Sequence, residues 1–295
     1  MKHFTLPKEG GLVEKNIPSD ILHSYEKIRT EIYDQSTTAS EVIADAIIDS
    51  INACQGRTFR LGLSTGVTPV SLYKWLTRKY QEGKVSFSNV EVYSIDEYYP
   101  YGKGEPQSRN SILHNSLLNA VDIKEENIHI PDGSVPEDKI TAYCEEYDKM
   151  VRGLDMLVIG MGEMAQVGFN EAGTSPVSRT RTVLLSYQSR KRQGKNFNGD
   201  FKHTPSQAIT IGIDTMMSAK RIVLMAWGED KANAVKHVCE CNPDYEYPAS
   251  LLQGHQNICC YVDETAGSLL TRVVSPWLVG PCDWTRKFIR KAVVW

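Results

Sequence analysis

The order of the apolar segments predicts an α/β protein with a doubly wound, mostly parallel, Rossmann-like sheet that has helices on both faces. Short apolar runs typical of strands alternate along the chain with segments of helical periodicity. The run 154–159 is almost continuously apolar, as a strand buried on both faces requires. No internal repeat and no linker rich in Pro, Gly and Ser interrupts the alternation, so residues 1–295 are predicted to form a single domain.

The individual elements follow from periodicity and from capping residues. Apolar residues at helical spacing predict helices over 19–33, 38–54, 69–80, 108–120, 137–152, 228–239, 248–253, 264–274 and 283–294. Runs rich in β-branched and aromatic residues predict strands over 58–63, 90–95, 128–130, 154–159, 207–212, 221–226 and 258–262. Thr38 to Glu41 has the pattern of a capping box. Thr68 suits the N-cap of the third helix, and Pro69 suits its first position.

The composition indicates an ordinary globular protein and gives no sign of several classes of partner. The 295 residues carry a net charge of −3, so neither nucleic acid nor an anionic membrane is expected as a partner. No apolar run approaches the roughly 20 residues of a membrane span, and the N-terminus lacks an apolar signal-peptide core. An odd number of cysteines, with Cys239-x-Cys241 and adjacent Cys259-Cys260, is typical of reduced thiols in the cytoplasm. No second Cys or His pair has the spacing of a zinc site, so no metal and no cofactor are expected.

The segment after the strand at 154–159 has the composition of a ligand-binding loop. Gly160 and Gly162 allow a sharp turn and a close approach of the backbone to a ligand, and the polar residues Gln166 and Glu171 follow. In an open α/β sheet, ligands bind beyond the carboxyl ends of the strands. An ordinary transition from strand to loop would also produce this pattern, because a lone Gly-x-Gly is weak evidence.

Two further strand ends carry candidate binding groups. The first is a loop of small residues between a strand and a helix, formed by Thr65, Gly66, Val67 and Thr68. Its backbone N–H groups could bind an anion, although a capped turn without a ligand would look the same. The second is Asp96, which directly follows the strand at 90–95 and is a candidate acid or base. Acidic residues at strand ends are also common as solvated loop charges.

The sequence Gly-x-Gly-x-x-x-x-Val-Gly-Phe-Asn-Glu at 160–171 resembles the signature of glucosamine-6-phosphate deaminases, also called glucosamine-6-phosphate isomerases. The family pattern has Asp, Gly and His where this chain has Met164, Ala165 and Gln166. In the family the His catalyses the opening of the sugar ring, and the Asp orients the His and favours its charged form. The resemblance therefore implies the fold and ancestry of the family, with two catalytic residues replaced.

The resemblance implies that the chain binds a phosphorylated amino sugar. Asp96 is then the group that moves the substrate's proton, and Glu171 is a second acid or base. Because each follows an apolar strand, the two carboxyl groups are expected to converge on one cleft. Lys231, in the first turn of a predicted helix, is expected to pair with the phosphate, since the helix dipole otherwise disfavours a cation there. Lys195 is the best candidate for a further phosphate ligand, with Arg192 as the alternative. The expected substrate-binding residues are Thr65, Gly66, Val67, Thr68, Gln166, Asn170, Lys195 and Lys231.

The resemblance covers residues 41–270, with one further departure: Ser108-Arg109 stands where the family usually has Ser-Tyr. The first hypothesis is an enzyme that converts an amino-sugar phosphate to fructose 6-phosphate and ammonia, with weakened or altered activity because of Met164 and Gln166. The alternative is a non-catalytic sugar-phosphate sensor. A 6-phosphogluconolactonase-like hydrolase is the second enzyme alternative, although that sister family lacks Phe-Asn-Glu. The sequence does not identify the exact sugar phosphate or any allosteric effector. It also leaves the oligomeric state open, with a homo-oligomer as one of the alternatives.

Overall fold

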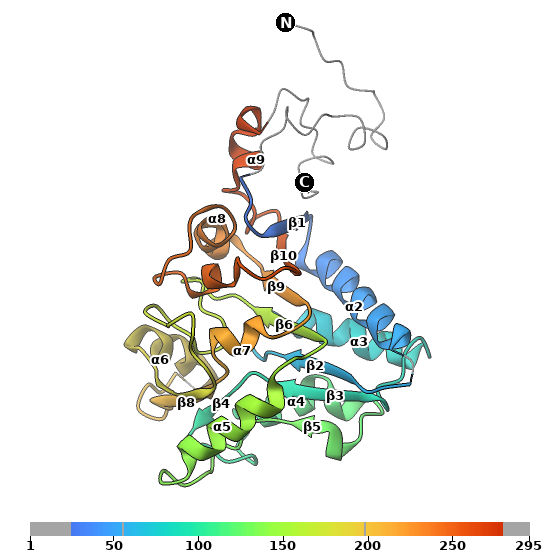
Figure 1. The fold of residues 1–295 in the computed structure, drawn as a ribbon, viewed down its shortest axis with the longest axis vertical. Helices are drawn as coiled ribbons and strands as arrows, with labels where there is room; N and C mark the ends of the chain where they lie inside the picture. Colours follow the sequence, from blue (N-terminus) through green and yellow to red (C-terminus); the bar gives the residue numbers. More distant parts are fainter. Residues whose placement is uncertain (1–24, 55, 198, 280–295) are drawn as a thin grey trace, which may run out of the picture.

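The computed structural model describes residues 25–54, 56–197 and 199–279, which are organised around a parallel β-sheet (Figure 1). The sheet has seven strands in the order β1-β10-β9-β6-β2-β3-β5, and every neighbouring pair is parallel. Its strands are β1 (Arg29–Tyr33), β2 (Phe59–Leu63), β3 (Val90–Ser94), β5 (Ile128–His129), β6 (Met156–Gly160), β9 (Ile222–Ala226) and β10 (Ile258–Asp263).

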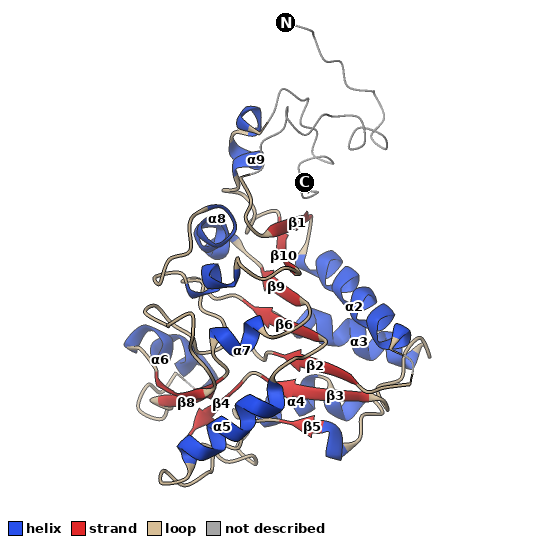
Figure 2. Ribbon diagram, viewed as in Figure 1, coloured by secondary structure: helices blue, strands red, loops and turns tan. Residues whose placement is uncertain are grey.

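Helices cover both faces of this sheet (Figure 2). Along β9, Ile222 and Leu224 join the core shared with α5, α7 and α8, whereas Val223 and Met225 join the core shared with α2, α3 and α4. The helices are α2 (Ser36–Ala53), α3 (Val70–Gln81), α4 (Arg109–Ser116), α5 (Ile140–Val151), α6 (Tyr187–Gln193), α7 (Ile213–Met217), α8 (Ala232–Glu240) and α9 (Thr271–Val274). The 3₁₀ helices are η1 (Leu118–Ala120), η2 (Glu125–Asn127), η3 (Gly194–Phe197), η4 (Glu229–Lys231), η5 (Pro248–Leu252) and η6 (Pro276–Leu278). This arrangement confirms the predicted doubly wound fold. Among the described residues, no helix has both the length and the apolarity to span a bilayer.

A second sheet of three antiparallel strands begins at the end of β3. Ile95 alone separates β3 from β4 (Asp96–Tyr99), which pairs with β8 (Gln207–Thr210). β8 in turn pairs with β7 (Arg181–Leu184). The sequence correctly places Asp96 at the carboxyl end of a parallel strand, but the residues after it continue as an edge strand of this small sheet instead of an open loop.

The helix predicted over 19–33 is wrong where the structure describes it. Arg29–Tyr33 forms β1, an edge strand paired with β10. Thr30 and Ile32 are buried while the residues between and beside them are more exposed, which is the period of a strand. Both side chains are β-branched and fit a pleated surface better than a helix. The first part of the predicted helix, and the helix predicted over 283–294, lie outside the described residues.

Two predicted helix caps are wrong, by three residues for α2 and by one residue for α3. α2 begins at Ser36, so Thr38 lies inside the first turn and Gln35 occupies the N-cap. The N-cap of α3 is Pro69, so Thr68 precedes the cap. Neither N-cap side chain accepts a hydrogen bond from a backbone N–H group of its helix. Local capping patterns identify that a helix begins, but not which residue begins it.

Four other predicted helices have different ends. The segments 108–120, 137–152 and 264–274 contain α4, α5 and α9, each shorter than predicted and flanked by turns or 3₁₀ helix. The segment 228–239 opens with η4 before α8 begins. Short 3₁₀ turns are frequent at helix ends because the terminal N–H and C=O groups lack α-helical partners.

The topology places the carboxyl ends of β2 and β6 side by side. From β2 the chain adds β3 and β5 on one side and then returns to β6 on the other side of β2. This reversal is a topological switch point, where open α/β sheets bind ligands. The loops that follow these two strands are residues 64–68 and 160–171, and both contain predicted binding residues.

Candidate active site

The loops after β2 and β6 contact each other at the switch point. The backbone N–H of Gly160 donates to Ser64 Oγ at 3.1 Å. A Cβ atom at residue 160 would lie 2.9 Å from the Cβ of Thr68, so the two loops approach this closely only because residue 160 is glycine. Trp227, just beyond β9, donates from Nε1 to the carbonyl oxygen of Thr68 at 2.9 Å. These contacts hold the 64–68 loop against the ends of β6 and β9.

The 64–68 loop presents donors to its surroundings. Within the described part of the chain, none of the backbone N–H groups of residues 65–68 donates a hydrogen bond. Gly66 has a φ of +112°, a conformation that glycine adopts without strain. Thr65 Oγ1 is buried and has no hydrogen-bond partner among the described residues. Buried polar groups normally have partners, so the loop has the donor set that a phosphate group would satisfy.

The basic residues predicted to reach the phosphate differ in their contacts. Lys231 ends η4, its Nζ pairs with the carboxylate of Asp230, and its side chain is 14% exposed. Arg192 on α6 places its guanidinium 3.4 Å from the carboxylate of Glu163 in the loop after β6. Lys195 on η3 is exposed and makes no ion pair with any described residue. Arg192 therefore contacts the loop after β6, and a role of Lys195 in binding the phosphate stays a prediction.

Asp96 is buried between an arginine and the loop after β6. It is 5% exposed, and its Oδ1 has no hydrogen-bond partner among the described residues. Arg109 Nε lies 3.6 Å from that oxygen. On the other side, a Cβ at Gly168 would lie 3.4 Å from Asp96 Oδ2 and 2.8 Å from Thr210 Oγ1. Burial raises the pKa of Asp96 above its ordinary value, and the charge of Arg109 opposes the rise. A carboxylate with a raised pKa is a stronger base.

Glu97 fixes the start of α4 relative to Asp96. Its carboxylate accepts hydrogen bonds from the backbone N–H groups of Tyr98 at 2.8 Å, Arg109 at 2.8 Å and Asn110 at 2.9 Å. The last two belong to the first turn of α4, where negative charge is favoured. Burial nevertheless raises the pKa of Glu97 to about 7, because it outweighs these hydrogen bonds. The contact anchors Arg109, the first residue of α4, beside Asp96.

Asn170 holds the end of the loop after β6 in place. Its side chain is fully buried, and Nδ2 donates to the carbonyl oxygens of Val167 at 3.0 Å and Ile211 at 2.8 Å. Its Oδ1 accepts from a guanidinium N–H of Arg181 at 3.1 Å. Both amide protons and the amide oxygen are therefore engaged within the protein. This geometry gives Asn170 a role in positioning the loop.

Glu171 has one oxygen engaged and one without a partner. Its Oε2 accepts from the backbone N–H of Ser186 at 3.1 Å, while Oε1 is buried and has no hydrogen-bond partner among the described residues. Glu171 lines a pocket of about 460 Å³ together with Phe169 and Arg181. Asp96 is not among the residues that line this pocket. That Asp96 and Glu171 share one cleft therefore stays a prediction.

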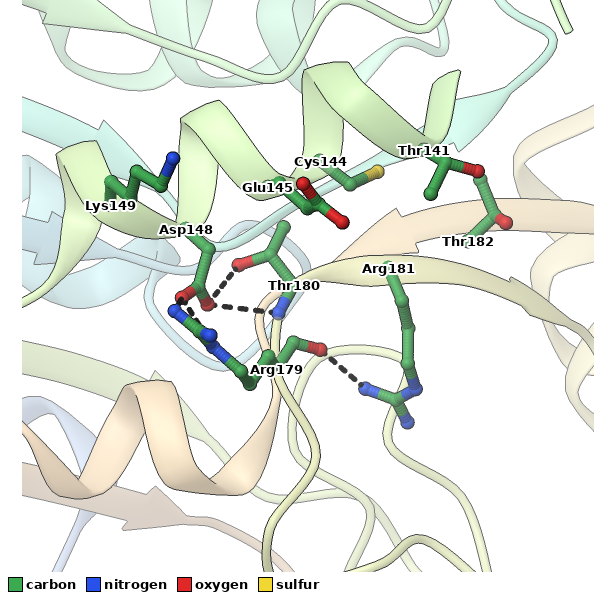
Figure 3. A pocket seen from close by; sticks show the side chains of 9 residues that line it. All are labelled: Thr141, Cys144, Glu145, Asp148, Lys149, Arg179, Thr180, Arg181 and Thr182. Atoms are coloured by element: carbon green, nitrogen blue, oxygen red, sulfur yellow. Dashed lines mark hydrogen bonds and ion pairs between the residues drawn. The ribbon is translucent and has the colours of Figure 1, made fainter. Parts of the chain in front are cut away.

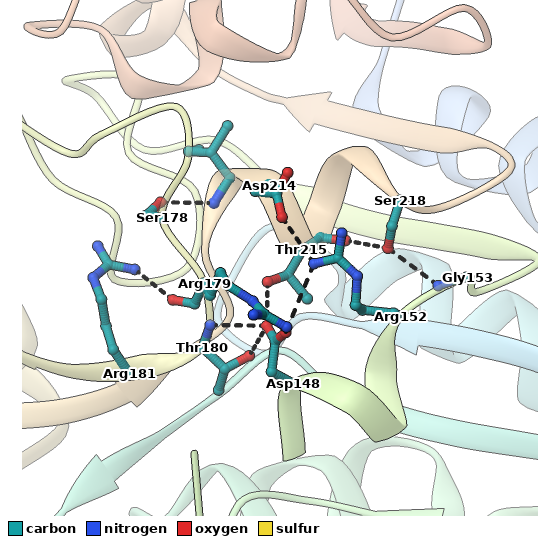
Figure 4. Close-up of polar contacts among 11 residues, drawn as sticks. Asp148, Arg152, Gly153, Ser178, Arg179, Thr180, Arg181, Asp214, Thr215 and Ser218 are labelled. Carbon is teal, nitrogen blue, oxygen red and sulfur yellow. Dashed lines mark hydrogen bonds and ion pairs between the residues drawn. The ribbon is translucent and has the colours of Figure 1, made fainter. Parts of the chain in front are cut away.

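A second pocket, of about 310 Å³, lies between α5 and the segment leading into β7 (Figure 3). Asp148 on α5 is 1% exposed there, and its Oδ2 accepts from Arg179 Nε at 2.9 Å and Nη2 at 2.7 Å. Its Oδ1 accepts from Thr180 N at 3.0 Å and Oγ1 at 2.9 Å, and also from Thr215 on α7 (Figure 4). One carboxylate thus connects α5 and α7 to the segment that carries Arg181. Arg181 in turn donates to Asn170, at the end of the loop after β6.

Comparisons with known proteins agree with this geometry. Residues 34–167 match the family described as glucosamine-6-phosphate isomerases/6-phosphogluconolactonase. Glucosamine-6-phosphate deaminase 2 of Bacillus subtilis is 38% identical over 71% of this chain and 85% of its own length. The chain belongs to the glucosamine-6-phosphate deaminase family. A solved monomeric glucosamine-6-phosphate deaminase superposes with a TM-score of 0.78 at 32% identity, over 82% of this chain and 100% of that one.

Two other matches show a similarity that covers only part of the relative or only the fold. A glucosamine-6-phosphate deaminase-like protein of Bacteroides thetaiotaomicron is 38% identical over 96% of this chain, but this chain spans only 43% of that relative's length. A 6-phosphogluconolactonase from Leishmania guyanensis superposes with a TM-score of 0.66 at 18% identity, over 82% of this chain and 98% of that chain, and shares the fold alone. The family assignment made from the 160–171 signature is thus confirmed.

The departures from the family signature occupy one turn of the loop after β6. Ala165 is fully buried and has a φ of +55°, a conformation that favours the glycine found in the family pattern. Gln166 Oε1 accepts from the backbone N–H of Met164 at 3.0 Å. The same side chain lies across Gly162, where a Cβ would be 2.2 Å from Gln166 Cδ. The Met164 side chain is 55% exposed. The substituted loop is therefore closed on itself by the amide of Gln166.

Sequence reasoning missed the residues that hold this site together. Arg109 was visible only as a departure from Ser-Tyr, and Asp148 only as a polar position in a predicted amphipathic helix. Glu97 directly follows Asp96, and no local pattern indicates that its carboxylate accepts from the first N–H groups of α4. No local pattern marks such residues, because their partners are distant in sequence. Among the described residues, no group of three or more His, Cys, Asp or Glu side chains is arranged to hold a metal ion.

Proposed function

We propose that this chain catalyses the deamination of an amino-sugar phosphate, with glucosamine 6-phosphate and water giving fructose 6-phosphate and ammonia. Its relatives in the family carry the name of this activity. The observation that carries the proposal is the placement of two groups at one switch point. Unpaired N–H groups of residues 65–68 lie after β2, and the buried base Asp96 lies after the neighbouring strand β3, against the loop from β6.

The phosphate group is assigned to the 64–68 loop. Its backbone N–H groups and Thr65 Oγ1 would bind the phosphate oxygens, and Lys231 and Arg192 would balance the charge. Asp96 then takes the proton from C2 of the open-chain amino aldehyde and returns a proton to C1. The resulting imine at C2 is hydrolysed by water, which releases ammonia and leaves the ketose. Glu171 is proposed as the second acid or base, through Oε1, which has no hydrogen-bond partner among the described residues.

Ring opening is proposed to be the slow step. The family's His is replaced by Gln166, whose amide can hydrogen-bond to a sugar oxygen but cannot transfer a proton. General acid–base catalysis typically contributes about 10²–10⁴-fold, so a loss on that order is expected at this step. Uncatalysed ring opening still supplies the open-chain form, so the later proton transfer can proceed.

A sugar-phosphate sensor is the second candidate function. It is favoured by the loop after β6, where Gln166 is tied to the backbone of Met164 and Met164 itself is largely exposed. Such a protein would keep the anion loop and would lack turnover. We also propose a cytoplasmic location, because the described cysteines are all free thiols. The oligomeric state is not part of the proposal.

The test is an ammonia-release assay on glucosamine 6-phosphate, with calorimetric binding of the same sugar phosphate to the same sample. Asp96→Asn should lower ammonia release by about 10²–10⁴-fold while changing the dissociation constant less than about threefold. Asp214→Asn, at a half-exposed aspartate, is the control and should change neither. Binding without ammonia release in the wild type would establish the sensor. Absence of both, or hydrolysis of 6-phosphogluconolactone instead, would contradict both candidates.

A further inference from the structure

Arg109 is a buried arginine whose side chain makes no hydrogen bond with any described residue. It is 5% exposed, and none of its guanidinium N–H groups donates to any described residue. The guanidinium carbon lies 4.6 Å from the ring centre of Tyr98 and 5.1 Å from that of Phe169, so the charged group is held between two aromatic rings. Arginines buried to this extent are normally paired with acceptors. The unpaired donors therefore indicate a binding role.

The only charged contact of Arg109 within the described residues is with the candidate base. Its Nε lies 3.6 Å from Asp96 Oδ1, too far for a direct hydrogen bond, and both atoms are buried without hydrogen-bond partners. A buried donor and a buried acceptor that face each other at this distance form a composite site. An oxygen atom bound there can accept from the guanidinium while the neighbouring carbon lies beside the carboxylate.

We propose that Arg109 is a catalytic residue that binds the substrate oxygen on which negative charge develops as Asp96 removes a proton. The inference rests on the proposed function and names the group that stabilises its charged intermediate. The substrate class is an open-chain sugar phosphate whose carbonyl carbon is bonded to the carbon that carries the acidic proton.

The proposed step is balanced within the site. Asp96 takes the proton from carbon, and the electron pair of that C–H bond becomes the carbon–carbon double bond of an enolate. The π pair of the former carbonyl moves to its oxygen, which accepts hydrogen bonds from Arg109. The C=C pair then takes the proton back from Asp96 at the former carbonyl carbon, while the lone pair of the amino nitrogen forms the C=N bond. One N–H proton moves to the oxygen, so the products are a hydroxymethyl group and the imine. No oxidant, reductant or additional reactant is needed.

The surroundings of Arg109 suit this task better than a purely structural one. Glu97 anchors its backbone N–H, so the position of the side chain is set from outside the site. Phe169, in the loop after β6, and Tyr98, on β4, orient the plane of the guanidinium. Gln166 leaves the loop after β6 without a cationic side chain at that position, and Arg109 supplies a permanent cation from the start of α4.

The test compares Arg109→Met, Arg109→Lys and Arg78→Met with the wild type. Arg78 is the matched control, because it also lies over an aromatic ring, 5.1 Å from that of Trp75, and pairs with an acid, Glu82, on the outside of α3. Arg109→Met should lower kcat for ammonia release on the order of 10²-fold and leave KM within about threefold. Arg109→Lys should lose less, because it keeps the charge but not the planar donor set. Arg78→Met should change neither constant.

A binding arm separates this inference from the proposed function. The probe is a five-carbon aldonohydroxamate 5-phosphate, whose planar, acidic hydroxamate mimics an enolate, and the reference ligand is glucitol 6-phosphate, which has no carbonyl group. Arg109→Met should weaken the hydroxamate on the order of 10²-fold and leave glucitol 6-phosphate within about threefold. If the wild type releases no ammonia but Arg109→Met still weakens only the hydroxamate, deamination is refuted and the role of Arg109 in binding the charged oxygen is supported. Equal changes for both ligands, no hydroxamate binding, or an unchanged kcat in a folded Arg109→Met would overturn the inference.

Discussion

Replacing Asp148 by Asn should strongly destabilise the fold, because one carboxylate satisfies donors from two separate segments. Asp148 is 1% exposed and accepts hydrogen bonds from Arg179, Thr180 and Thr215. Asparagine keeps one oxygen and presents an NH₂ group where the other oxygen stood. If the NH₂ group replaces Oδ2, it faces the N–H groups of Arg179. If it replaces Oδ1, it faces the donors of Thr180 and Thr215.

The size of the effect follows from these contacts. A hydrogen bond to a charged group contributes about 1.5–3 kcal/mol, and removing one partner of a buried charge pair costs about 3–5 kcal/mol. The side chain of Arg179 is 58% exposed, so water can replace part of its pairing and the lower end applies. We therefore expect a loss of roughly 3 kcal/mol in the free energy of unfolding. For a protein of this size that corresponds to a drop in Tm of roughly 6–12 °C.

Urea unfolding followed by tryptophan fluorescence and by far-ultraviolet circular dichroism measures the change. Glu82→Gln is the matched control, because Glu82 also pairs with an arginine, Arg78, at 2.9 Å but lies on the surface, where the side chain of Arg78 is 64% exposed. This exposed pair should contribute less than about 1 kcal/mol. If the two variants lose the same small free energy, then Asp148 does not hold α5 and α7 to the segment before β7.

Three further predictions concern the site itself. Met164→Asp combined with Gln166→His should raise ammonia release on the order of 10²-fold, and by more than either single change, because the Asp acts through the His; no gain would mean that another group opens the ring. Glu97→Gln should flatten the pH dependence of Tm between about pH 4.5 and 7. The pKa of Glu97 is raised from 4.5 in the unfolded chain to about 7 in the folded protein. Protonated Glu97 therefore stabilises the fold fully below pH 4.5, and roughly 3 kcal/mol of the free energy of unfolding is lost as the pH rises through about 7. Glu26 has a similarly raised pKa, so part of the slope should remain, and an unaltered slope would refute the assignment to Glu97. Gly160→Ala should weaken binding of a hexose phosphate by about tenfold or more, because its methyl would lie 2.9 Å from a side-chain carbon of the 64–68 loop; unchanged affinity in calorimetry would show that this loop does not bind the phosphate.

The sequence determined the fold class and the two loops of the switch point. Runs such as 58–63 and 154–159 are predicted to be buried strands, because their short length and mostly apolar composition suit a sheet covered on both faces. The small residues after each run marked where the backbone turns. Such patterns are local, so they can be read from neighbouring residues alone. The same reasoning failed for β1, because Ile28 and Ile32 fit the period of a helix while Thr30 and Ile32 fit that of a strand, and only the pairing with β10 decides between them.

Only the tertiary structure decided which side chains meet at the site. Asp96 and Arg109 approach because Glu97 fixes the first turn of α4, and Asp148 meets Thr180 because α5 packs beside the segment that leads into β7. These contacts join residues 12 to 32 positions apart in sequence. Their energies depend on burial and on the alignment of donors with acceptors, which exist only once the layers have packed. A single sequence records the residue types at these positions, but it does not record which of them face each other.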